Sequence, residues 1–156
     1  MVPRLVCEGM SLFSQFAHHR LLLYYKGDIS ALTMFAQQAN GSVCFPTPLP
    51  ALSSPLEEDE AQAGKISMHP ASLVNAINQI LHLDNDLLMV EPGYTQQIDA
   101  PGGIITVHMA RFKVLDPPHK IMSVRDCTMK TLPELRGRPP AEMELLRRAY
   151  IQVMEG

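Results

Sequence analysis

The stretch that decides the fold is Ile104–Leu115, with the sequence IITVHMARFKVL, which is the most strand-like segment of the chain. It is rich in β-branched residues, and turn residues bound it on both sides, Gly102-Gly103 before it and Asp116-Pro117-Pro118 after it. Successive side chains of a strand point to opposite faces, and both faces of this segment begin with an apolar side chain, Ile104 or Ile105. The pattern predicts a strand that other elements cover on both faces where it begins.

The residues before and after this strand predict its partners. Leu87–Val90 is a short apolar run that Pro92-Gly93 closes, and Tyr94–Ile98 follows as a second strand. A tight turn at Pro101-Gly102-Gly103 then leads into the Ile104–Leu115 strand. Ile121–Val124 is a further short strand in this interpretation. Together these segments predict an antiparallel meander of three or four strands.

Two helices are predicted next to the meander. Ile66–Leu83 contains no Asp, Glu, Lys or Arg, and Pro70 suits the first turn of a helix there. Its apolar residues repeat at intervals of three and four: Leu73, Val74, Ile77, Ile80 and Leu81. A second helix starts at Pro139-Pro140 and runs toward Gly156, with Glu144 and Arg148 spaced for an i,i+4 ion pair.

The N-terminal block, residues 11–41, carries apolar residues mostly at helical spacing. It predicts one helix over about 11–25 and a second helix that begins at Asp28 and stops at Asn40-Gly41. The alternative for residues 20–26 is a β-strand, because Tyr24-Tyr25 favours β structure. The helical spacing favours the helix over this alternative.

The block ends in a connector of residues 45–64, with four prolines followed by the acidic run Glu57–Glu60. Such a composition buries little apolar surface, which predicts disorder or an extended path on the surface. Taken together, the chain is predicted to be a single domain over residues 1–156. The expected class is α+β, with a small antiparallel sheet of three to four strands packed with about four helices.

Charge and composition exclude several classes of protein. The formal net charge of −3 gives no long-range attraction to phosphate backbones or anionic lipid, which argues against a nucleic-acid binder or a peripheral membrane protein. The one basic cluster is Arg136, Arg138, Arg147 and Arg148, which we interpret as a solvated helix face. Neither a signal peptide nor a membrane-spanning run is recognisable, and three widely spaced cysteines form no disulfide framework, so we expect a cytoplasmic protein.

No motif specifies a reaction. The six histidines are scattered, so we expect no metal site and no cofactor. Cys127 lies among charged residues, and a nearby cation would raise its thiolate content. A nucleophilic cysteine also needs a base such as His108 or His119 within hydrogen-bond reach. The weak catalytic candidates are therefore His108, Cys127, Asp116 and His119, with Arg111 as a further polar group for a pocket.

The uncharged helix supports a different class of function. A helix without ionised side chains is covered by other elements or by another subunit. We therefore predict that Leu73, Ile77, Ile80 and Leu81 form a partner or subunit face, and that the protein is a homodimer. The favoured function is a non-catalytic interaction or assembly module, and the alternative is a small enzyme or ligand-binding domain with a pocket between sheet and helices.

Overall fold

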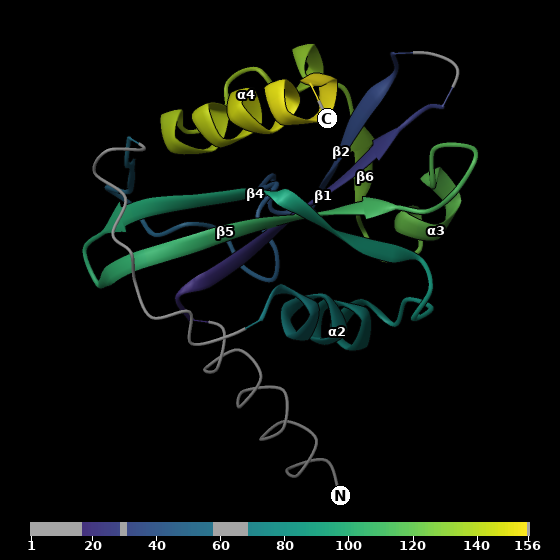
Figure 1. Cartoon of the computed structure of the whole chain (residues 1–156), viewed down its shortest axis with the longest axis horizontal. Helices are drawn as coiled ribbons and strands as arrows, with labels where there is room; N and C mark the ends of the chain where they lie inside the picture. The colour runs from purple at the N-terminus through teal and green to yellow at the C-terminus, as the bar shows by residue number, and fades with distance from the viewer. Residues whose placement is uncertain (1–16, 29–30, 58–68, 156) are drawn as a thin grey trace, which may run out of the picture.

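A computed structural model describes residues 17–28, 31–57 and 69–155 (Figure 1). A curled, six-stranded mixed sheet lies between two helices, with α2 on one face and α4 on the other. The strands are β1 (His19–Lys26), β2 (Thr33–Gln37), β3 (Ser54–Pro55), β4 (Leu88–Ala100), β5 (Gly103–Phe112) and β6 (Thr128–Lys130). The helices of the described residues are α2 (Pro70–Leu81), α3 (His119–Ser123), α4 (Pro140–Glu155) and a 3-10 turn, η2 (Pro133–Leu135).

The sheet order is β3-β4-β5-β1-β2-β6, and one of its pairings is parallel. β1 runs parallel to β5, from His19 opposite Thr106 to Tyr24 opposite Arg111, whereas all other neighbours are antiparallel. The long β4–β5 hairpin turns at Pro101–Gly102, as the turn residues predict, and β4 is irregular between Val90 and Thr95. A parallel pair needs a long connection, and here that connection includes β2, β3, α2 and β4.

The predicted fold class is therefore wrong. The sheet has six strands and mixed pairing instead of three or four antiparallel strands, and the described residues contain three α-helices instead of about four. The error arises in the N-terminal block, whose two predicted helices are the hairpin β1–β2 across the described part of the block. Residues 11–16 of the first predicted helix lie outside the described residues.

Strand β1 was mistaken for a helix because it is buried on both faces. Leu21 and Leu23 point into the core under α2, whereas Leu22 and Tyr24 point into the core under α4. All four are at most 2% exposed, so the strand shows an unbroken apolar run and no alternation. The alternative of a β-strand at residues 20–26 is the correct one.

Two further expectations need correction. Leu87–Val90 and Tyr94–Ile98 belong to one strand, β4, because Pro92-Gly93 lies within its irregular part and does not end it. Ile121–Val124 falls at helix α3 and its end, since the chain turns sharply after Pro117-Pro118. The strand predicted over Ile104–Leu115 is confirmed as β5, and the C-terminal helix is confirmed as α4.

The sheet divides the interior into two cores, as Figure 1 shows by the placement of α2 and α4. The core under α2 includes Leu21, Leu23, Tyr25, Leu73, Ile77, Ala110, Phe112 and Met122. The core under α4 includes Leu22, Tyr24, Tyr94, Val107, Met109, Leu145, Leu146 and Ala149. The described half of the connector takes part as well, because Phe45 is 1% exposed and pairs its backbone with Leu21.

Candidate functional sites

The four catalytic candidates do not form one site. His108 is buried in β5, Cys127 is buried between α3 and β6, and Asp116 and His119 are exposed in and after the loop that follows β5. In the part of the chain that the structure describes, no hydrogen bond or ion pair joins any two of them. Acid–base or nucleophilic catalysis needs such groups within hydrogen-bond reach, so this set gains no support.

The buried thiols lack the surroundings of a nucleophile. Cys127 is 3% exposed and donates to the Arg125 carbonyl at 3.4 Å, and burial, with the Asp126 charge, raises the pKa of its thiol. Burial also raises the pKa of Cys44 to about 12. Both thiols are therefore protonated at neutral pH, the opposite of the low-pKa thiolate that a reactive cysteine requires.

Arg111 lies on the other face of β5 from His108, because odd and even positions of a strand alternate. Its Nη2 donates to the Lys26 carbonyl and to Asp28 Oδ1, each at 3.1 Å. A small open groove of about 230 Å³ lies beside it, with Met89 and Leu115 among its lining residues. Arg111 and His108 therefore do not line the same wall of a pocket.

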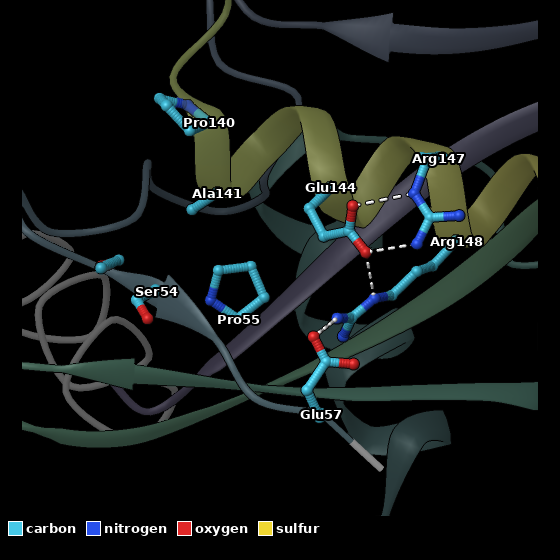
Figure 2. A pocket seen from close by; sticks show the side chains of 9 residues that line it. Ser54, Pro55, Glu57, Pro140, Ala141, Glu144, Arg147 and Arg148 are labelled. Atoms are coloured by element: carbon cyan, nitrogen blue, oxygen red, sulfur yellow. Dashed lines mark hydrogen bonds and ion pairs between the residues drawn. The ribbon is translucent and has the colours of Figure 1, made fainter.

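A larger open groove of about 490 Å³ lies between strand β3 and the first half of helix α4 (Figure 2). Its lining residues are Ser53, Ser54, Pro55, Glu57, Pro140, Ala141, Glu144, Arg147 and Arg148. The volume falls within the usual range for small-ligand sites, but those sites are mostly apolar with few polar groups. This groove has charged side chains along α4 instead.

The charges of the groove are paired with one another. Glu144 accepts from both nitrogens of the Arg147 fork, at 2.8 and 2.6 Å, and from Arg148 Nε at 2.7 Å. Arg148 also donates to the Leu56 carbonyl and to Gln96 Oε1, both at 2.8 Å, and lies 3.6 Å from Glu57. The hydrogen bonds from the two arginines hold the pKa of Glu144 at about 2.

This network ties α4 to β3 and β4, which is a structural role. The i,i+4 spacing of Glu144 and Arg148 predicted one of its ion pairs, and that prediction is confirmed. The contacts with Leu56, Glu57 and Gln96 were missed, because residues so far apart in sequence carry no local signal. The groove contains no nucleophile–base pair among these contacts.

Helix α2 presents two different surfaces. Leu73 and Ile77, from the predicted partner face, are at most 1% exposed and pack on the chain's own sheet, while Ile80 and Leu81 are partly buried. The side chains that point outward are exposed and uncharged: Ser72, Asn75 and Gln79.

Helix α3 adjoins the end of α2. Arg125 donates to the carbonyls of Leu81 and His82 in α2 and its cap, and to the Ile121 carbonyl in α3. Two apolar side chains of this region are exposed, Ile121 at 37% and Val124 at 77%. We call Ser72, Asn75, Gln79, Ile121 and Val124 the α2–α3 face.

A group of histidines lies at the opposite end of α2. His19 in β1 and His108 in β5 are buried, and their rings stack with centroids 6.3 Å apart and planes 13° apart. His69 is the N-cap of α2 and accepts the Ala71 N–H with its Nδ1 at 3.1 Å. Burial lowers the pKa of His108 to about 4, with smaller contributions from His19 and His69.

No local pattern groups these histidines, because neighbouring strands bring positions 19 and 108 together. Over the described ranges, no three His, Cys, Asp or Glu side chains are grouped so that they could hold a metal ion.

The described helices are also too short or too polar to cross a membrane. No known family matches the chain, and no curated protein is similar to it.

Proposed function

We propose that the protein is a non-catalytic interaction module that self-associates through the α2–α3 face. The observation that carries this proposal is the outward surface of α2, which is exposed and has no ionised side chain over Pro70–Leu81. Charged side chains normally cover an exposed helix surface, and their depletion is typical of the central part of an interface.

A second copy of the chain is the partner that this surface favours. In a two-fold symmetric dimer, the same patch meets itself, so side chains near the axis lie close to their own copies. Like charges there would repel, whereas Asn75 and Gln79 can donate and accept hydrogen bonds with identical groups. Ile121 and Val124 are exposed near the C-terminal end of α2, where Arg125 bonds to the Leu81 and His82 carbonyls, and they supply apolar area that association would remove from water.

The ligand-binding alternative has less support. The β3–α4 groove is large enough for a small molecule, but Glu144, Arg147 and Arg148 are already paired with one another in it. A ligand that used these groups would have to displace the ion pairs within α4 and the hydrogen bonds from Arg148 to Leu56 and Gln96 that tie α4 to the sheet.

The test is the mass of the protein in solution. Sedimentation equilibrium or light scattering at micromolar concentrations should give a dimer, and Asn75→Lys should weaken dimerisation at least about tenfold because it places two like charges near the axis. Ser54→Lys makes the same charge change at an exposed position in β3 and should leave the dimer unchanged. A monomer throughout, or an Asn75→Lys variant that dimerises as tightly as the wild type, would contradict the proposal.

A further inference from the structure

We propose that the small groove beside Arg111 binds an acidic peptide segment of a partner protein, whose carboxylate takes the place of Asp28 on the Arg111 guanidinium. The groove lies where β5 ends, and its lining residues are Asp28, Met89, Arg111, Phe112, Lys113, Val114 and Leu115. The proposal is independent of the self-association, because Arg111 follows the odd-numbered residues of β5 on the α4 side of the sheet, whereas α2 and α3 pack on the other side.

Arg111 is held in place and keeps part of its hydrogen-bonding capacity. Its Nη2 donates to the Lys26 carbonyl and to Asp28 Oδ1, both at 3.1 Å, so the guanidinium is fixed against the end of β1. Among the described residues no acceptor bonds to its Nε or Nη1, and the side chain is 34% exposed. A ligand carboxylate can therefore reach this guanidinium from solvent.

The Asp28 carboxylate is a replaceable partner of Arg111. A carboxylate binds a guanidinium most strongly through two parallel hydrogen bonds, and one of these must come from Nη2. Both hydrogens of Nη2 already go to Lys26 and Asp28, so such a ligand displaces Asp28. The Asp28 side chain is 69% exposed, and an ion pair so open to solvent contributes little stability. Exchange of one carboxylate for another therefore has a small free-energy cost.

The charge of the groove favours an anion. Its lining residues include two cations, Arg111 and Lys113, and one anion, Asp28. Lys113 is exposed, and its ammonium makes no ion pair with any residue that the structure describes. Glu91, on the neighbouring strand β4, does not line the groove and accepts the Tyr24 hydroxyl at 2.7 Å. Both cations can therefore pair with acidic side chains of a ligand.

Apolar side chains beside these cations favour a peptide over a small anion. Met89 is 51% exposed and Leu115 is 83% exposed, and both line the groove. Methionine adapts its shape to a partner, and Met and Arg are enriched in protein interfaces. The volume of about 230 Å³ lies below the usual range for small-ligand sites, and it suits one or two side chains of a peptide.

The wall that carries Leu115 is fixed before a ligand binds. The Lys113 N–H donates to the Leu87 carbonyl at 2.8 Å, and the Tyr25 hydroxyl donates to the Leu115 carbonyl at 2.6 Å. These bonds tie the segment after β5 to the chain that enters β4 and to β1. The wall therefore loses little conformational freedom on binding, which favours affinity.

An NMR titration of the full chain with a defined peptide tests the proposal. The probe is a short peptide of alternating glutamate and leucine with blocked ends, and the control peptide has glutamine in place of glutamate. The glutamate peptide should bind with a Kd of about 1 mM or lower and shift the amide signals of Met89 and Arg111–Leu115. The glutamine peptide should bind at least about tenfold more weakly, because it cannot form charge-assisted hydrogen bonds with Arg111.

Two variants should change the affinity for the glutamate peptide in opposite directions. Arg111→Gln should weaken binding at least about tenfold, because the charged fork is lost. Asp28→Asn should strengthen binding about threefold, because a neutral amide competes less for Arg111. Arg147→Gln and Asp99→Asn make the same changes at exposed positions outside the groove, and each should alter the affinity less than about twofold.

Four results would overturn the proposal. The first is equal affinity for the two peptides or no binding of either, and the second is a set of shifted signals that lies outside the groove. The third is a loss of affinity in Arg147→Gln as large as that in Arg111→Gln, which would indicate a general charge effect. The fourth is an Asp28→Asn variant that binds no more tightly than the wild type. Since Asp28 is exposed, this variant keeps the test decisive even if Arg111→Gln does not fold.

Discussion

Replacing Glu142 by glutamine should lower the free energy of unfolding by about 3 kcal/mol. Glu142 lies in the first turn of α4 and is 2% exposed. Its carboxylate accepts from Ser42 Oγ at 3.1 Å, from the Val43 N–H at 3.2 Å, and from Arg138 Nε and Nη2 at 3.1 and 3.3 Å. One side chain thus joins α4 to the segment that leads from β2 into the core.

The expected loss in the free energy of unfolding follows from the contacts of the Glu142 carboxylate that a glutamine amide cannot make. Its amide nitrogen would face donors where a carboxylate oxygen now accepts, and the charge that pairs with Arg138 would be lost. Breaking a buried ion pair by removing one partner costs about 3–5 kcal/mol. The Arg138 side chain is 23% exposed, so water can solvate part of its charge, which places the expected cost at the lower end of that range.

Urea unfolding at neutral pH, followed by circular dichroism, measures this cost. For a chain of this length, 3 kcal/mol corresponds to a fall in Tm of about 6–12 °C, which calorimetry checks independently. Glu155→Gln makes the same chemical change at an exposed position at the end of α4 and should cost less than about 0.5 kcal/mol. If Glu142→Gln costs less than about 1 kcal/mol, the described contacts do not anchor α4 and the reasoning is refuted.

Three further outcomes are expected. The arginines hold the pKa of Glu144 at about 2, below its unfolded value of 4.5, so its stabilisation is present above pH 4.5 and lost as the pH falls through about 2. Because the carboxylate is partly exposed, the loss should be about 1 kcal/mol in urea titrations, and it should vanish in Glu144→Gln. Arg125→Ala should cost about 2 kcal/mol in thermal melts, because three carbonyls at the junction of α2 and α3 lose their donor, and Arg125→Lys should recover only part of this. In a Cys7→Ser background, Cys44 and Cys127 should react with a thiol reagent only in urea, since burial raises both pKa values, and prompt reaction of the native protein would contradict this.

The elements that the sequence predicted well have strong local signals. β5 has β-branched residues between two turn motifs, and α4 has proline at its start and a regular apolar stripe. Helix α2 is also predicted, and Pro70 lies in its first turn as the sequence indicates. For the two helices the apolar residues repeat at the helical period, and for β5 the β-branched residues and the bounding turns indicate a strand.

The elements that were missed depend on distant partners. β1 lies between β5 and β2 in the sheet, and the cores under α2 and α4 cover its two faces, so its side chains show no alternation. A continuous apolar run of this length fits a helix and a buried strand equally well. What distinguishes them is the parallel pairing of His19–Tyr24 with Thr106–Arg111, more than eighty residues later, which no local pattern records.

The candidate sites divide in the same way. The Glu144–Arg148 pair lies within one helix, so its spacing alone predicts it. The stacked pair of His19 and His108 arises from the parallel pairing of β1 with β5. The sequence predicted a helix where β1 lies, so it could not indicate that these two rings lie side by side.

A comparison of the two covering helices gives the strongest argument for the proposed interface. Both α2 and α4 bury an apolar stripe against the sheet, so packing makes the same demand on each. On its exposed side α4 carries ionised residues such as Arg147, whereas α2 carries Asn75 and Gln79 and nothing charged. The sheet does not require this difference, and the proposed self-association would account for it, because a surface that meets its own copy avoids like charges.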